Sequence, residues 1–196
     1  MSLSHTVKTL IQGTPALLTG GIPGARAGDE YLAFNQTDLI AATTVDVKSP
    51  EFEGGQEIPF RYSAEGQNIS PPITWSNIPT GSKSIALLVE DPDAPLPQPF
   101  VHWIAFNIDP FTLSLHEGVP VEEQMMLKQG KNSGLKTGWT GMAPPKGDTA
   151  HHYHFQVFAL DEMLQLENGI GRSALIKAMA GHVISRGEVV GKFRRP

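Results

Sequence analysis

The sequence contains no cysteine, which removes several kinds of chemistry. Disulfide bonds, thiolate metal sites and a cysteine nucleophile are all excluded. The chain also lacks any run of about 20 apolar residues, the length that a helix needs to cross a bilayer, so we expect no transmembrane segment. Glycine and proline interrupt the apolar stretches near the start. We therefore expect no secretion signal there and a cytoplasmic location.

Positive charge is in deficit. The chain has 15 Lys and Arg against 20 Asp and Glu, a formal net charge of -5 and a pI near 5.8. Neither nucleic acid nor an anionic membrane surface would attract such a protein as a whole. We expect no nucleic-acid partner, and any anion that binds must be held by a local pocket.

Glycine and proline are abundant instead, at 20 and 16 of 196 residues, and favour a turn-rich β protein over long helices. Short runs with strand character, without helices between them, predict a mainly β fold, an antiparallel β-sandwich with a few short peripheral helices. The predicted strands cover residues 44–47, 58–62, 70–75, 84–90, 103–108, 151–160 and 188–193. A late helix is predicted over residues 174–180, with Gly181 as its stop.

We predict two parts in the chain. Residues 1–43 form a helical and irregular N-terminal arm, and residues 44–196 form the β domain. Apolar residues at helical spacing predict a helix over residues 3–12. The segment 30–34 is expected to dock the arm. Packing of the arm on its own domain is the simpler expectation, whereas a lid or a homodimer contact are the alternatives.

An acidic loop lies between two apolar runs. Asp91-Pro92-Asp93 follows the predicted strand 84–90, and His102-Trp103 opens the next strand. The prolines at positions 92, 95, 97 and 99 stiffen the connection and can hold side chains in place. Two carboxylates thus converge with a histidine on a rigid loop, a type of segment that often carries binding residues.

A second informative segment covers residues 138–155. Its glycines at 138, 141 and 147 let the backbone approach a ligand and present N–H groups, which suits an anion-binding wall. Strand alternation places His151 and Tyr153 on one face, and His152 and His154 on the other. A carboxylate can keep a histidine protonated, so the acidic loop and an anion are compatible in one pocket. A zwitterionic head group would satisfy both signs of charge.

Five ordered pieces of sequence occur together: Val89-Glu90-Asp91-Pro92-Asp93-Ala94-Pro95, His102-Trp103, Gly138-x-x-Gly141, Pro144-Pro145-x-Gly147 and His151-x-Tyr153. In this order and spacing they resemble the phosphatidylethanolamine-binding protein family, in its bacterial branch similar to the Raf kinase inhibitor protein. The resemblance covers roughly residues 44–193. Each piece alone is common, whereas the set is specific.

The resemblance implies a β-sandwich with a small pocket at one end that binds phosphate-like anions, without a metal or an organic cofactor. Carried over position by position, it assigns ligand binding to Asp91, Asp93, His102, Gly141, His151 and Tyr153, and wall-shaping roles to Pro95, Trp103 and Pro144. No catalytic residue is assigned. Three positions depart from the family pattern: Trp139 replaces the usual tyrosine, Met142 the usual proline, and His152 the common arginine.

We predict a non-enzymatic protein that binds a phosphate-like anion or a phospholipid head group. Protonated His151 or His102, Tyr153 and loop N–H groups would hold the anion, while Asp91 and Asp93 orient the histidines. A second hypothesis is regulation of a protein partner, such as a kinase. A third is a weak acid-base hydrolase that uses the same pocket. A zinc site, from His152 with His154 or from His102 with Asp91, is a rival without tight ligand spacing.

Overall fold

The computed structural model describes residues 26–122 and 127–196, and within them nine strands, one α-helix and four 3-10 helices. The strands are β1 (Thr43–Thr44), β2 (Asp46–Lys48), β3 (Ile73–Ser76), β4 (Ser84–Asp91), β5 (Phe100–Ile108), β6 (Ser114–Leu115), β7 (Lys128–Gln129), β8 (His151–Leu160) and β9 (Val183–Phe193). The helices are α1 (Arg172–Met179) and the 3-10 helices η1 (Asp29–Tyr31), η2 (Ala33–Asn35), η3 (Thr37–Leu39) and η4 (Phe60–Tyr62).

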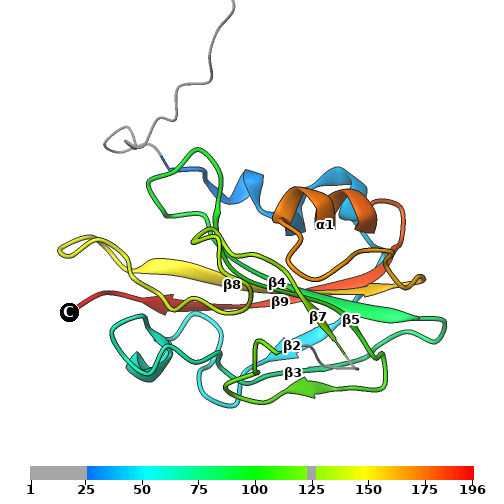
Figure 1. Ribbon diagram of the computed structural model, residues 1–196, viewed down its shortest axis with the longest axis horizontal. Coiled ribbons are helices and arrows are strands. Elements are labelled where there is room, and N and C mark those ends of the chain that lie inside the picture. The colour runs from blue at the N-terminus through cyan, green and yellow to red at the C-terminus, as the bar shows by residue number, and fades with distance from the viewer. Residues whose placement is uncertain (1–25, 123–126) are drawn as a thin grey trace, which may run out of the picture.

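Three layers are stacked in the molecule. A six-stranded sheet of order β1-β9-β8-β4-β5-β7 lies in the middle, and a three-stranded sheet of order β2-β3-β6 covers one face. Helix α1 and the 3-10 helices of the N-terminal arm cover the other face (Figure 1). The strand pairs are antiparallel except for β1, which runs parallel to β9. The predicted antiparallel sandwich with peripheral helices is confirmed.

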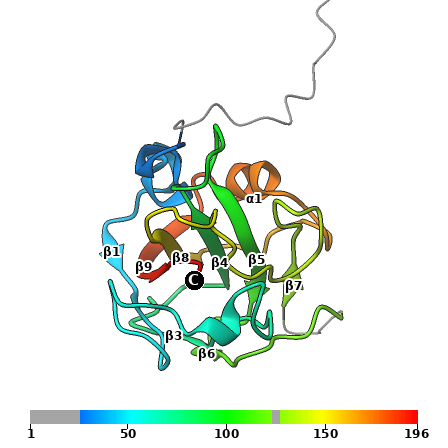
Figure 2. The same cartoon turned by 90° about the vertical axis from the view of Figure 1, so that its left-hand side faces the viewer.

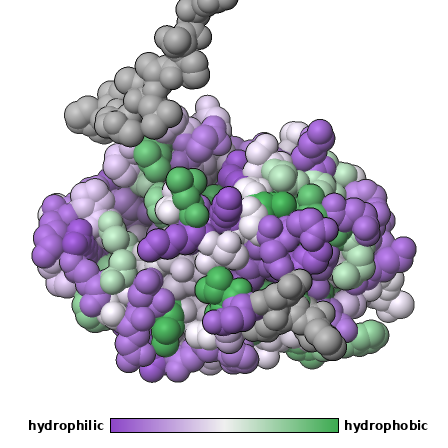
Figure 3. All heavy atoms as spheres, viewed as in Figure 1, coloured by the Kyte–Doolittle hydropathy of each residue, from purple (hydrophilic) through white to green (hydrophobic). Residues whose placement is uncertain are grey.

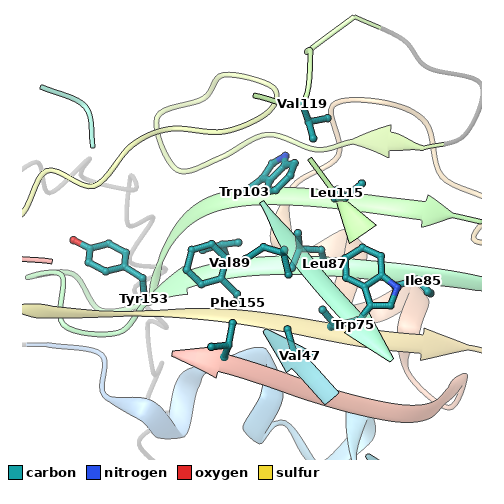
Figure 4. Packing of buried hydrophobic residues seen from close by; sticks show 14 of the residues in the cluster. Val47, Trp75, Ile85, Leu87, Val89, Trp103, Leu115, Val119, Tyr153 and Phe155 are labelled. Carbon is teal, nitrogen blue, oxygen red and sulfur yellow. The ribbon is translucent and has the colours of Figure 1, made fainter. Parts of the chain in front are cut away.

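Strand β4 is buried along its whole length because both faces of the central sheet are covered. Ile85, Leu87 and Val89 pack in the cluster between the two sheets (Figure 4). The alternate residues Ala86 and Leu88 pack under α1 and the arm. The continuous apolar run that predicted this strand therefore reflects two hydrophobic layers, one on each side of the sheet.

The predicted strand over residues 58–62 is wrong. Ile58 donates its N–H to the carbonyl of Lys192 at the sheet edge, but the chain then turns into the 3-10 helix η4. Pro59 has no N–H for a strand ladder, and its carbonyl accepts the N–H of Tyr62 at 3.1 Å. This turn brings the following residues, 63–68, toward the end of the sandwich.

The described part of the arm packs on the helical side of the central sheet. Leu32, Ala33 and Leu39 are buried there, so the predicted docking by segment 30–34 agrees with their positions. The helix predicted over residues 3–12 lies outside the described residues. The division of the chain at residues 43 and 44, the lid and the homodimer contact stay predictions.

Hydrophilic residues cover most of the face seen in Figure 3, and the hydrophobic residues form small separate groups. Among the described residues, the most exposed large apolar side chains are Phe111 and Leu135. Isolated apolar side chains of this kind are normal on a protein surface and need no partner.

Candidate functional site

A pocket of about 380 Å³ opens at one end of the sandwich, where β4 ends and where β5 and β8 begin. Strand pairing brings these points together, since Asp91 lies opposite Phe100 and Glu90 lies opposite His154. Figure 2 views the molecule from this end. The lining residues are Ala64, Asp91, Ala94, Pro95, Leu96, Phe100, His102, Thr140, Gly141, Ala143, Pro144, Pro145 and His151.

His151 lies between two carboxylates. Its Nδ1 donates to Oδ2 of Asp91 at 2.8 Å, and its Nε2 lies 3.4 Å from Oδ2 of Asp148. Burial on its own lowers the pKa of His151, but hydrogen bonding to Asp91 and the charge of that carboxylate outweigh it, and Asp148 and Asp93 add to the rise. The net pKa is raised, so the ring keeps its proton to a higher pH than an ordinary histidine does.

Asp91 itself is fixed by the loop that follows it. Its Oδ1 accepts the backbone N–H groups of Asp93 at 2.8 Å and Ala94 at 3.1 Å, while Oδ2 accepts from His151. A carboxylate offers about four acceptor positions, and three are used here. Asp91 therefore orients His151 and stabilises its charge, which is the role that the sequence predicted for this aspartate.

His102 is the second histidine in the lining, and its environment differs. Nδ1 lies 2.7 Å from the carbonyl of Thr140, so this nitrogen carries the proton and donates. Burial lowers the pKa of His102, and the hydrogen bond to Thr140 and the charge of Asp91 do not reverse that shift. The ring is therefore neutral near pH 7, and its Nε2 carries a lone pair that accepts hydrogen bonds.

Asp93 does not line the pocket. Its Oδ2 accepts from the backbone N–H of His152 at 2.9 Å and faces His152 Nδ1 at 2.7 Å, and its Oδ1 accepts from Arg26 at 3.0 Å. Burial favours a higher pKa for Asp93, but the hydrogen bonds from His152 and Arg26 lower it overall. The two aspartates of the Asp-Pro-Asp motif thus serve different histidines on opposite faces of β8, as strand alternation predicted for His151 and His152.

Gly141 lines the pocket, but its N–H group is already engaged. It donates to Oδ1 of Asn68 at 2.7 Å, and Asn68 holds the left-handed backbone with φ 55°. The N–H of Thr140 donates to the carbonyl of His102 at 2.9 Å. These two loop N–H groups hold the pocket wall together, whereas the sequence predicted that Gly141 binds the ligand.

Gly141 also allows a close approach of two backbone segments. A Cβ at this position would lie 2.4 Å from the backbone N of Ala64 and 2.5 Å from the backbone C of Ser63. Gly141→Ala should lower the free energy of unfolding by about 1–3 kcal/mol, as overpacking does. Chemical denaturation would measure it, with Gly54→Ala as control because no atom lies within 4 Å of a Cβ there. Equal stability of the two variants would contradict the close approach.

Tyr153 lies behind the pocket at the end of the row of core side chains along β8 (Figure 4). It is fully buried, it packs edge to face against His102 with ring centroids 5.1 Å apart, and its hydroxyl has no hydrogen-bond partner in the described part of the chain. Burial, together with the charges of Asp91 and Asp93, raises its pKa. The hydroxyl is therefore neutral near pH 7. Tyr153 does not belong to the pocket lining, so its predicted contact with a ligand stays a prediction.

The remaining predicted residues divide between the wall and the core. Pro95 and Pro144 line the pocket. Trp103 does not, since it is buried in the core and donates to Oε1 of Gln129 at 2.8 Å. Met142 is also a core residue, so this departure from the family pattern does not form the pocket floor.

Two residues at this end escaped the sequence analysis. Arg26 donates to Asp93 and to both oxygens of Asp148, and so links the arm to the loops on two sides of His151. Asp148 precedes His151 by three residues, and on a loop this spacing does not predict that the two side chains are in contact. Arg26 lies 122 positions before Asp148, and no local pattern connects the two.

The histidines considered as zinc ligands, His152 and His154, do not face a common point. His152 faces Asp93, whereas His154 faces Glu188 at 3.0 Å. Over residues 26–122 and 127–196, no group of three or more His, Asp or Glu side chains has an arrangement that could hold a metal ion.

Comparisons with known proteins agree with the fold and the motifs. A family model described as Phosphatidylethanolamine-binding protein matches residues 48–194. A UPF0098 protein from Pyrococcus horikoshii is 43% identical over 151 residues, which cover 75% of this chain and 75% of the relative.

Two solved structures are similar to this one. A phosphatidylethanolamine-binding protein homolog from Chlamydia trachomatis has a TM-score of 0.72 and 35% identity, with coverage of 79% of this chain and 100% of that chain. A protein of E. coli, described as a new member of the mammalian PEBP family, has a TM-score of 0.73 and 29% identity at the same coverage. In the described part of this chain, no helix has the length and apolar character needed to span a bilayer.

Proposed function

The chain belongs to the phosphatidylethanolamine-binding protein family, and from this premise we propose that its pocket binds a phosphate-like oxyanion, either free or as a phospholipid head group. The observation that carries the proposal is the position of His151, which lines the pocket with its Nδ1 at 2.8 Å from Oδ2 of Asp91, a carboxylate that raises the pKa of the ring. This Nδ1 is committed to Asp91, whereas Nε2 makes only a long contact of 3.4 Å with Asp148, which a ligand can replace. A hydrogen bond from a charged donor contributes about 1.5–3 kcal/mol, which is enough to select an anion.

The neutral His102 restricts the chemical type of ligand that the pocket favours. Its Nε2 accepts rather than donates, so it pairs best with a ligand that also carries an O–H or N–H group. A phosphate monoester that keeps one acidic proton has such a group, and so does the ammonium of ethanolamine phosphate. The volume of about 380 Å³ is at the low end of the range for small-molecule pockets and suits a head group.

Calorimetric titration of phosphate, sulfate and phosphoethanolamine tests the proposal. His151→Gln removes the charged donor, and we expect a loss of affinity of about 10- to 100-fold. His182→Gln is the matched control, because His182 also pairs with a carboxylate, Asp161 at 2.9 Å, but lies at the opposite end of β8. Equal binding to both variants, or no binding to the wild-type protein, would overturn the assignment of the pocket.

The pH dependence follows from the raised pKa of His151. The ring is protonated below its ordinary value of about 6.5, and the proton leaves only as pH rises through the higher pKa of the folded protein. Anion affinity should therefore be full below about pH 6.5 and fall above it. Sulfate is the suitable probe, since its charge stays constant over roughly pH 5.5 to 9 while phosphate titrates. Affinity that rises with pH would contradict a protonated His151.

Hydrolysis is a second candidate, because a histidine oriented by a buried carboxylate is also the arrangement of a general acid–base group, which in its protonated form donates to the leaving group. The samples prepared for calorimetry can be assayed for release of phosphate from phosphoethanolamine. Turnover that disappears in His151→Gln would establish the hydrolase, and binding without turnover would exclude it for this ester. A kinase or other protein partner, the cytoplasmic location and the homodimer contact stay predictions.

A further inference from the structure

We propose that Arg26 and Asp148 set the anion affinity of this pocket: Arg26 binds the incoming oxyanion, and the Asp148 carboxylate is the internal group that the anion displaces. The inference rests on the proposed function and names two residues that neither the motifs nor the family resemblance assigned. Neither residue belongs to the pocket lining; Asp148 contacts the lining residue His151, and Arg26 contacts Asp148, which links the arm to the site.

The two nitrogens of His151 lead to this inference. Nδ1 is held by Asp91 in a short contact of 2.8 Å between side chains that are only 1% and 5% exposed. Nε2 faces Asp148 across 3.4 Å, and the Asp148 side chain is 30% exposed. The first contact is a permanent part of the fold, whereas the second is long and open to solvent. A ligand that uses His151 must take Nε2, which is the position that Asp148 now occupies.

Arg26 approaches the same carboxylate from the other side. One guanidinium nitrogen donates to Oδ1 and Oδ2 of Asp148 at 3.0 and 3.1 Å, and the other donates to Asp93 at 3.0 Å. Arginine presents several donors in a fixed fork that fits the oxygens of phosphate as well as those of a carboxylate. Asp148 therefore contacts both of the cationic side chains that could donate hydrogen bonds to an oxyanion, Arg26 and His151.

The arm holds Arg26 at this place. Gly28 donates its N–H to the carbonyl of Pro92 at 3.3 Å. This bond fixes the backbone two residues after Arg26 against the Asp-Pro-Asp loop, and so keeps Arg26 beside that loop. Four residues later, Leu32 and Ala33 are buried on the central sheet. Because docking of the arm is separate from the pocket, substitution of Arg26 should leave the fold intact.

Charge explains why Asp148 must move. Arg26 and protonated His151 supply two positive charges, and Asp91, Asp93 and Asp148 supply three negative charges, which leaves a balance of -1 without counting His152, whose ring faces Asp93. A second anion in contact with His151 would meet an excess of negative charge.

Once Asp148 turns into solvent, the local balance is zero before the ligand enters. The carboxylate then gives up three contacts: the guanidinium of Arg26, Nε2 of His151 and the backbone N–H of Thr149, which donates to Oδ1 at 2.8 Å. An oxyanion with at least two terminal oxygens can replace Asp148 at Arg26 and His151, and water can satisfy the N–H of the exposed Thr149.

Calorimetric titration of sulfate at about pH 6, where His151 is protonated, tests both roles. Asp148→Asn keeps the shape but removes the competing charge, and its affinity should rise about tenfold, or ~1.4 kcal/mol. Arg26→Ala should lower affinity about tenfold. Matched controls lie at the far end of the sheet: Asp161→Asn removes an exposed carboxylate that also faces a histidine, and Lys83→Ala removes an exposed cation. Both controls should bind like wild type.

The pH profile separates competition from a merely structural role. Asp148 is one of the groups that raise the pKa of His151, together with Asp91 and Asp93 and against burial, which lowers it. His102 also lines the pocket, and its own pKa is lowered. Asp148→Asn should therefore bind more tightly at pH 6 but lose its affinity at a lower pH than wild type does. A structural defect would instead weaken binding at every pH.

The outcomes distinguish this inference from the proposed function beneath it. If neither wild type nor Asp148→Asn binds sulfate or phosphate, the pocket assignment itself is wrong. If wild type binds and Asp148→Asn binds equally or more weakly, the displaceable carboxylate is wrong while the pocket stands. Unchanged affinity in Arg26→Ala overturns the role of the arm. Tighter binding by Asp148→Asn than by wild type, together with weaker binding by Arg26→Ala, supports both roles.

Discussion

Asp91→Ala should lower the free energy of unfolding by about 3–5 kcal/mol at pH 6, the range found when one partner of a buried ion pair is removed. The substitution removes the carboxylate that stabilises the charge of His151, whose side chain is only 1% exposed, so the ring must either stay charged without this partner or lose its proton. It also leaves the N–H groups of Asp93 and Ala94 without their acceptor. Anion binding should be lost as well, because His151 is no longer oriented.

Urea denaturation at pH 6 and at about pH 8.5 would measure this effect. The loss of stability should be smaller at the higher pH, because a neutral His151 costs less to bury without a partner. Asp109→Ala is the matched control: Oδ1 of Asp109 likewise accepts a backbone N–H, that of Phe111 at 2.8 Å, but this side chain faces no histidine. We expect about 0.5–1.5 kcal/mol there. Equal losses in the two variants would contradict the buried ion pair.

Glu90→Ala should lower the free energy of unfolding by a similar amount, about 3–5 kcal/mol. The buried interactions that it removes lie on the other face of the central sheet, under the arm and α1. The Glu90 carboxylate is fully buried and accepts from three donors: the N–H of Ala33 at 2.8 Å, Nε2 of Gln156 at 2.9 Å and Nε of Arg172. Its removal leaves all three donors without that acceptor. Because Ala33 belongs to the arm, we also expect the arm to detach more readily from the sheet.

Thermal or urea denaturation measures the loss, and limited proteolysis reports on release of the arm. Glu188→Ala on β9, the strand beyond β8, is the matched control, since its carboxylate pairs with His154 but is 26% exposed. Partly exposed pairs contribute about 1 kcal/mol or less. An arm that resists protease equally in Glu90→Ala and in wild type would show that apolar packing of residues such as Leu39 holds it without the buried network.

Sequence motifs predicted part of the pocket. The sequence predicted correctly that Asp91, His102, Gly141 and His151 meet at one end of a sandwich, because the motifs lie at strand ends that antiparallel pairing brings together. It did not distinguish the roles of the two aspartates. That distinction depends on which carboxylate faces which side of β8, and the loop after β4 turns Asp91 toward His151 and Asp93 toward His152.

The sequence likewise could not show which of the two histidines, His102 or His151, carries a proton. Their residue type suggested that either could carry a proton for an anion. The structure assigns the proton to His151, which has a carboxylate at Nδ1, and leaves His102 neutral, because its Nδ1 meets only the carbonyl of Thr140 in a buried site. The partners come from segments 60 and 38 positions away and are not visible in the residues beside each histidine.

The sequence by itself determined the features that depend on local order: the strand β8, whose predicted bounds match those observed, the helix α1 to within two residues at either end, the alternation of His151 and His152, and the ordered motifs of the family. Only the tertiary structure decided that Arg26 lies against Asp148 and that the Gly141 N–H serves Asn68. The physical reason is distance along the chain. Periodicity and turn chemistry act over a few residues, whereas these contacts join segments 122 and 73 positions apart, which meet only after the two sheets have packed and the arm has docked.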